Sequence, residues 1–314
     1  NCQTSAINYI IIYLLANMKK NQIIILENRG LVLVQDVEAK GFLQNIISNN
    51  IDKVNKFNSI FSAILTPQGK YLYEFFIIKS EGGYLLDCHI EIKDDLIKHL
   101  SKYKLRSKIE IRDLSSSHAV GIISKDKFKE IQTELNSKEK TILYRKSPCF
   151  MDSRSSSLGA RILSSLENLH LTIKKLNLKI IDKSHYLELS HKEGIPAEGV
   201  KNLQNNLFAL ESNFEELNAI DFKKGCYVGQ ENTARMKLKN KLRKRILPIT
   251  SNKPLKISDE IKFNDQVVGK VLISDKYAFA LIKLFEPEFK EFSSQNLKVK
   301  ESDIQILIPS YLKL

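Results

Sequence analysis

One cysteine of the chain lies in a segment whose residue types favour a reactive thiol. The segment reads Lys224-Gly225-Cys226-Tyr227-Val228-Gly229-Gln230-Glu231, and Lys223 precedes it. Its two glycines allow positive φ angles or the close approach of another molecule. Residues 230–238 have a helical pattern, so Cys226 comes just before a helix N-terminus beside two lysines, and both features favour the thiolate. The alternative is that Cys226 is a small buried side chain, as free cysteines often are.

The other candidate groups form no metal site in the sequence. The four cysteines are Cys2, Cys88, Cys149 and Cys226, and no two of them form a C-x-x-C pair. That spacing argues against paired metal ligands and against a disulfide framework, and it indicates a reducing compartment. The histidines also lack metal-ligand spacing, so we predict no metal. Arg235 follows Glu231 by one helical turn, and we expect these two side chains to pair.

Composition and charge narrow the function classes. A chain of 314 residues with 43% hydrophobic and 27% charged residues is typical of a folded globular protein. No apolar run approaches the roughly 20 residues of a membrane span, so we predict no membrane partner. The net charge of +13 fits an anionic partner, but it also fits a chain rich in Lys, Ile and Asn from A/T-rich codons. The one dense basic cluster, Lys237–Arg245, fits a solvated helix end, an RNA-phosphate contact or an acidic partner protein.

The pattern of apolar residues predicts three units that position these groups. An α+β unit with a mostly antiparallel sheet spans about 18–115, and a second α+β unit spans about 116–245. Evenly spaced short strands over 246–314 predict a small β-barrel. Within these units we expect a helix capped by Asp94-Asp95, a helix from about Leu158 and a strand at Tyr186–Leu189. Residues 1–17, before Met18, are interpreted as an N-terminal extension, and a native packed helix is the alternative.

The cysteine segment, with Ala234-Arg235 just after it, resembles the hallmark of the YgfZ family. These are folate-binding proteins implicated in iron–sulfur cluster assembly and tRNA modification. They are related to a mitochondrial cluster assembly factor and, more distantly, to the glycine cleavage T-protein. Further segments match in the same order: Gly41-Phe42-Leu43-Gln44 with Asn49, Leu65–Lys70, Leu100–Arg106, Asp152-x-Arg154 with Leu158-Gly159-x-Arg161, Gly194-Ile195-Pro196 and Val268–Val271.

The resemblance implies a folate-enzyme-like domain of two α+β subdomains around a central pocket, followed by a C-terminal barrel. It implies a tetrahydrofolate-type ligand contacted by Tyr186. At a second folate-contacting position, where the family has an aromatic residue, this chain has Arg29, which could meet the ligand's carboxylates. It also implies that the cysteine loop acts on a transient iron–sulfur cluster. The partners would be the iron–sulfur assembly machinery and its 4Fe–4S client enzymes, with tRNA as a further candidate.

Two other functions and two compartments remain open at this stage. A folate-dependent aminomethyl transferase is one alternative, although the T-protein has acidic residues where this chain has Tyr73-Glu74. A basic tRNA-binding module built on Lys237–Arg245 is the other. We therefore expect an assembly factor that is not a classical enzyme. If the protein is an enzyme, we expect a folate-dependent transferase. The bacterial cytoplasm is the expected compartment, with the mitochondrial matrix as the alternative.

Overall fold

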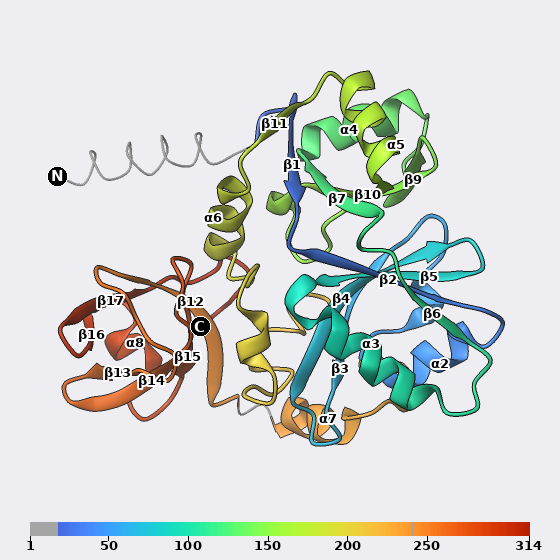
Figure 1. Cartoon of the computed structure of the whole chain (residues 1–314). Helices are drawn as coiled ribbons and strands as arrows, with labels where there is room; N and C mark the ends of the chain where they lie inside the picture. Colours follow the sequence, from blue (N-terminus) through green and yellow to red (C-terminus); the bar gives the residue numbers. More distant parts are fainter. Residues whose placement is uncertain (1–17, 240–241) are drawn as a thin grey trace.

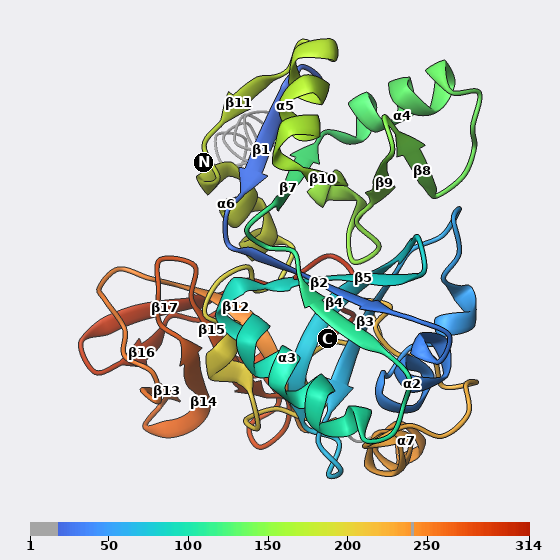
Figure 2. The same cartoon turned by 45° about the vertical axis from the view of Figure 1, so that its right-hand side comes forward.

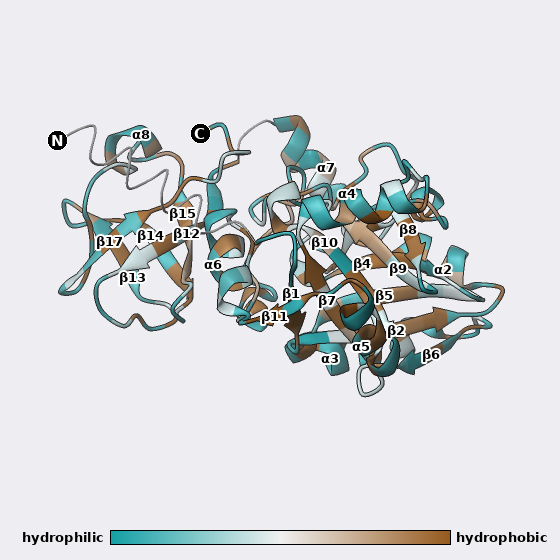
Figure 3. Cartoon of the chain, turned by 90° about the horizontal axis from the view of Figure 1, so that it is seen from above, coloured by the Kyte–Doolittle hydropathy of each residue, from teal (hydrophilic) through white to brown (hydrophobic). Residues whose placement is uncertain are grey.

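The described part of the chain forms two β-sheets and a closed barrel, and Figure 1 shows the barrel to one side of the two sheets. The computed structural model describes residues 18–239 and 242–314, so the predicted extension over 1–17 lies outside the described residues. Within the described part of the chain, no helix is long and apolar enough to cross a membrane. In Figure 3 the brown, hydrophobic residues concentrate in the strands, while the helices around them carry more teal. The apolar core therefore lies along the sheets and inside the barrel.

The first sheet has five antiparallel strands in the order β3-β4-β5-β2-β6. Their bounds are β2 Arg29–Gln35, β3 Ile60–Leu65, β4 Tyr71–Ser80, β5 Gly83–His89 and β6 Glu110–Asp113. Helices α2 (Ala39–Ile46) and α3 (Ile90–Lys104) accompany this sheet. Strands β3 and β5 are buried at every position, which is the pattern expected when both faces of a sheet are covered. This sheet supplies the first half of the predicted domain.

The second sheet has six strands in the order β11-β1-β7-β10-β9-β8. The bounds are β1 Gln22–Leu26, β7 His118–Ile123, β8 Thr141–Tyr144, β9 Ser147–Met151, β10 Ala160–Ser165 and β11 Lys179–Ile181. Helices α4 (Lys125–Glu134), α5 (Leu166–Lys175) and α6 (Ser184–Lys192) lie with it in Figures 1 and 2. Because β1 pairs with β7 and β11, the N-terminal strand belongs to the second sheet. The predicted first subdomain, about 18–115, is wrong in this respect.

Three predicted elements differ from the structure. The helix expected from Leu158 begins at Leu166, because Ser165 caps it by accepting from the N–H of Asn168 and the preceding residues form β10. The strand expected at Tyr186–Leu189 is part of α6. Its buried residues, Tyr186, Leu187, Ser190 and His191, have helical spacing that a four-residue window does not reveal. Helix α3 begins at Ile90, directly after β5, so Asp94-Asp95 is inside it and does not cap it.

The C-terminal strands form the predicted barrel, closed in the order β12-β15-β14-β13-β16-β17. Their bounds are β12 Lys244–Ser251, β13 Glu260–Phe263, β14 Gln266–Ile273, β15 Phe279–Lys283, β16 Leu297–Val299 and β17 Ser302–Ile306, and the short α8 covers Phe289–Phe292. The barrel has its own apolar core. Pro309 packs against Gly194, so the C-terminal segment contacts the residues that follow α6. Closure of the barrel leaves it without free strand edges.

A buried ion pair joins the two sheets. Arg161 of β10 donates to Asp87 of β5 over 2.7 Å, and both side chains are 0% exposed. Desolvating two charges is costly, so such a pair stabilises the fold only when both partners are present. The relative position of the two sheets is therefore fixed by charge as well as by apolar packing.

Replacing one partner of this pair tests that claim. We expect Arg161→Met to lower the free energy of unfolding by about 3–5 kcal/mol, because Asp87 is left buried without one of its cations. The matched control is Arg112→Met on β6. Arg112 pairs with Glu110, and both side chains are 51% exposed. This variant should lower the free energy of unfolding by about 0–1 kcal/mol. Urea unfolding measures both. Equal losses would contradict the assigned role of Arg161.

Candidate functional site

The cysteine segment is a loop that leads into α7 (Gln230–Lys239), one residue longer than the predicted helix. The loop is partly buried and partly exposed. Lys224, Tyr227 and Gly229 are buried, Val228 and Gln230 are half-buried, and Gly225, Cys226, Glu231 and Arg235 are exposed. The thiol of Cys226 is thus accessible, held between buried neighbours. The alternative of a small buried cysteine is excluded by this exposure.

Lys224 anchors the loop to the end of α2. Its ammonium group donates to the carbonyl oxygens of Gln44, Ile47 and Asn49 over 2.7, 2.6 and 3.0 Å. Burial lowers the pKa of Lys224 to about 8, while three carbonyl acceptors at a helix C-terminus favour the charged form. Because its three donors are used by backbone carbonyls, Lys224 positions the loop. The neighbouring Lys223 is exposed.

Gly229 anchors the other end of the loop against the predicted turn at 66–69. Its φ is +86°, and a Cβ atom there would lie 2.5 Å from the carbonyl oxygen of Thr66. Gly69 in that turn also has a positive φ, +78°, and faces the carbonyl oxygen of Gly229. Asn232 adds a hydrogen bond of 2.9 Å from its side-chain amide to the carbonyl of Gln68. Two glycine-containing motifs that lie far apart in the sequence therefore pack directly on each other.

The three described cysteines differ sharply in their surroundings. Cys88 and Cys149 are buried, and burial raises the pKa of Cys88 to about 12 and that of Cys149 strongly as well. Cys226 is exposed. Among residues 18–239 and 242–314, no group of three or more His, Cys, Asp or Glu residues is placed to hold a metal ion. Within the described chain, Cys226 is thus a single accessible thiol, and any cluster bound there would need ligands from another molecule.

The predicted helical pair of Arg235 with Glu231 is not among the ion pairs of the described residues. Arg235 instead donates to the side-chain oxygen of Asn232 over 2.6 Å. The basic cluster is also divided. Lys237 pairs with Glu215, Arg245 pairs with Glu216 over 2.5 Å, and Lys241 lies outside the described residues. Both described ends of the cluster are therefore engaged within the protein.

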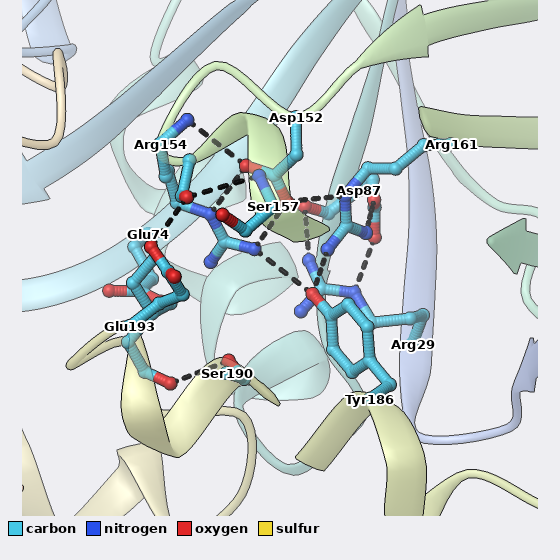
Figure 4. Close-up of polar contacts among 12 residues, drawn as sticks. Arg29, Glu74, Asp87, Asp152, Arg154, Ser157, Arg161, Tyr186, Ser190 and Glu193 are labelled. Carbon is cyan, nitrogen blue, oxygen red and sulfur yellow. Dashed lines mark hydrogen bonds and ion pairs between the residues drawn. The ribbon is translucent and has the colours of Figure 1, made fainter. Parts of the chain in front are cut away.

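A second polar centre lies between the two sheets, and Figure 4 shows it. It is a closed network of buried side chains. Its members are Arg29, Asp87, Asp152, Arg154, Arg161 and Tyr186. Asp87 accepts from Arg29 over 2.5 Å as well as from Arg161. Sequence analysis identified Tyr186 and Arg29 as site residues but not Asp87 and Arg161, because a charge inside an apolar strand has no periodic signal.

Tyr186 and Asp152 complete the network. The hydroxyl oxygen of Tyr186 accepts from Arg161 over 2.7 Å and from Arg154 over 3.1 Å. Asp152 accepts from Arg154 over 2.8 Å and from Arg161 over 3.3 Å. Burial alone would raise the pKa of Asp152, but the two guanidinium groups hold it below its usual value. Every charge of the network is paired, as buried charges must be.

Glu74 lies at the edge of this network, beside Arg154. It is 5% exposed, and burial raises its pKa to about 7 against the opposing effect of Arg154 and Arg29. His89 lies 3.5 Å from it, and burial together with the three arginines lowers the pKa of His89 well below its usual range. The hydroxyl of Tyr71 and Nε2 of His89 are buried and have no hydrogen-bond partner among the described residues.

The central space does not fit a folate while the network is closed. The cavity beside Glu74 and Arg154 has a volume of about 10 Å³, enough for about one water molecule. Arg29 and Tyr186, the predicted folate contacts, are 8% and 4% exposed and are bonded inside the network. Folate contact by these two residues stays a prediction.

Comparison with known proteins first defines the class of fold. No family model matches the chain. The structure superposes on glycine cleavage system aminomethyltransferase T of Bartonella henselae with a TM-score of 0.70. The match covers 95% of this chain and 88% of that chain, at 10% sequence identity. The protein therefore has the aminomethyltransferase fold, as predicted, with two α+β subdomains and a C-terminal barrel.

The curated relatives are more specific. The chain is 30% identical over 227 residues to the mitochondrial iron–sulfur cluster assembly factor IBA57 homologue of Pyricularia oryzae, a match covering 71% of this chain and 56% of that protein. It is 28% identical over 250 residues to the mitochondrial factor IBA57 of Mus musculus, covering 74% and 67%. The chain spans a little over half the length of the first of these relatives. The chain is thus homologous to iron–sulfur cluster assembly factors, and these relatives are named as mitochondrial proteins.

The two glycines of the cysteine loop provide a matched test of its geometry. We expect Gly229→Ala to lower the free energy of unfolding by about 2 kcal/mol or more, because its φ is positive and its Cβ would meet backbone atoms. Gly225→Ala is the control, since a Cβ there meets no atom within 4 Å. Urea unfolding compares the two. A Gly229 variant as stable as the control would contradict the packing of the two glycine motifs.

The raised pKa of Glu74 predicts a pH dependence of stability. A buried carboxyl whose folded pKa is about 7 contributes stability below its unfolded pKa and loses it as pH rises through the folded value. We expect the free energy of unfolding of Glu74→Gln to rise relative to that of the natural protein by up to about 3 kcal/mol between about pH 5 and about pH 8. The size follows from about 1.4 kcal/mol per pKa unit. Thermal unfolding across this range measures the difference. Parallel pH profiles would show that Glu74 does not titrate in this window.

Proposed function

We propose that this chain is an assembly or repair factor for iron–sulfur clusters that serves 4Fe–4S client enzymes through the thiol of Cys226. The observation that carries the proposal is the exposed Cys226 on a loop fixed at both ends, by Lys224 and by Gly229. The homology to assembly factors supports the choice of iron–sulfur chemistry. The chain is then an accessory factor and not a classical enzyme.

The chemistry follows from what a single thiolate can do. Iron–sulfur clusters are held by cysteine thiolates, and a thiol loses its proton when it binds iron. Cys226 would supply one such ligand to a cluster that passes between proteins, and the partner would supply the others. A fixed loop presents the sulfur at a defined position, so that little ordering is needed when the partner binds. The cluster is the cargo of this exchange, and the partner is a component of the iron–sulfur assembly machinery.

The sequence resemblance to the YgfZ family supports three further properties. They are tetrahydrofolate binding, an effect on tRNA modification, and aminomethyl transfer as a second activity. Folate would occupy the central space only after Arg29 and Tyr186 leave their present partners. For the compartment, the relatives are named as mitochondrial proteins, which supports a mitochondrial location for this chain, with the bacterial cytoplasm as the alternative.

The role of the thiol is tested in cells that lack the natural factor. We expect Cys226→Ser to leave the activity of 4Fe–4S enzymes near that of cells without the protein, because serine does not replace a thiolate ligand to iron. The control is Lys262→Gln, an exposed change on β13 of the barrel, which should restore activity. Protein levels are measured in parallel to exclude a folding defect. Full activity of the Cys226 variant would remove the thiol from the mechanism.

A further inference from the structure

A basic cleft separates the two sheets on the side of the molecule that carries α4 and β8. Its volume is about 550 Å³, and it is lined by α4, the segment before β8, the start of β3 and Asn218. In Figure 2, α4 and β8 lie above the five-stranded sheet. Five lysines line it: Lys53, Lys125, Lys129, Lys138 and Lys140. The single acidic residue among the lining residues is Glu139.

The lysines of this cleft are available to a ligand. All five are exposed. Lys53 pairs with Asp221 over 2.9 Å. Across residues 18–239 and 242–314, the ion pairs include none formed by the other four lysines. Like charges gathered around one cavity repel one another, and an anionic ligand would relieve that repulsion.

The walls of the cleft are held in place by amide side chains. Asn218 donates to the carbonyl of Ser153 over 3.0 Å, and Gln132 donates to the carbonyl of Glu139 over 2.8 Å. The hydroxyls of Ser59 and Thr141 are 2.8 Å apart and link the two sheets at the edge of the cleft. Because these amides are used within the protein, the ammonium groups are the donors left for a ligand.

The chemistry of the lining favours carboxylates over nucleic acid. Lysine is a flexible point charge, so the five ammonium groups suit separate anionic groups spaced along a chain. Single-stranded nucleic acids also require aromatic faces on which bases stack. The rings that line the cleft, Phe61, Phe128 and Phe150, are at most 2% exposed and offer no such face. A cavity of this size takes a short stretch of extended chain and excludes a duplex.

We propose that this cleft docks an extended, carboxylate-rich segment of a partner protein. Its place in the fold is informative, because Asn218 lines it and Lys53 pairs with Asp221, at the start of the segment that leads to Cys226. A docked partner would thus lie beside the cysteine loop. The inference concerns binding alone and does not depend on any action of Cys226.

The experiment measures the binding of a fluorescent hexaglutamate peptide to the full chain by anisotropy, with hexaglutamine as the neutral comparison. We expect hexaglutamate to bind more tightly, and its affinity to fall as salt screens the charges. The triple variant Lys129→Glu/Lys138→Glu/Lys140→Glu should weaken binding by about tenfold or more, since each reversed charge changes a surface interaction by a fraction of a kcal/mol or more.

The matched control reverses three exposed lysines of the barrel, Lys262→Glu/Lys270→Glu/Lys290→Glu, which changes the net charge equally. It should retain the affinity of the natural protein, as should Cys226→Ser. Equal loss in the barrel variant would show that net charge alone drives binding and would overturn the proposal. Equal affinity for hexaglutamine, or displacement of the peptide by single-stranded RNA at lower concentration than by free hexaglutamate, would overturn it as well. Failure in this assay leaves the client-enzyme test of Cys226 unaffected.

Discussion

The charge network between the two sheets is the constraint on which the rest of the domain depends. Arg161 reaches Asp87 in one sheet and Asp152 in its own, while Tyr186 of α6 accepts from two arginines. Once these groups are out of water, each must keep its partner, because an unpaired buried charge costs several kcal/mol. The sheets and α6 are therefore locked in one arrangement. The same requirement fills the space between the two sheets with paired side chains and leaves a cavity of about 10 Å³ beside Glu74 and Arg154.

The cysteine motif divides into residues that position the loop and one residue that is accessible for chemistry. Lys224 satisfies three carbonyls near the C-terminus of α2, where backbone oxygens lack helical partners. Gly229 meets the turn at 66–69 with a backbone that a larger residue would strain. These contacts bring residues from three distant parts of the chain together around Cys226. Two residues of the motif, Lys224 and Gly229, thus hold the loop in place, and Cys226 between them is exposed to solvent.

The sequence predicted the architecture more completely than it predicted the residues of the candidate site. The barrel and most strands follow from short apolar runs, which local patterns report well. The membership of β1 in the second sheet depends on pairing with β7 and β11, and no local pattern reports such distant pairing. Asp87 and Arg161 were missed for a related reason. Each lies in a buried strand among apolar residues, and its partner comes from the other sheet. The residue types around Cys226 left a buried thiol open as an alternative, which its exposure excludes, and they did not predict the use of Lys224 as an anchor.

The placement of the lysines bears on the origin of the net charge. Composition alone leaves +13 open to two explanations, an anionic partner or a codon bias that scatters lysines. On the barrel, Lys253, Lys298 and Lys300 each pair with a nearby carboxylate, as scattered surface lysines often do. In the cleft, five lysines line one cavity, and among the described residues only Lys53 of these five forms an ion pair, with Asp221. Codon bias raises the number of lysines but does not arrange them around a cavity beside the cysteine loop. The local arrangement therefore favours a carboxylate-rich partner over composition as the reason for this part of the charge.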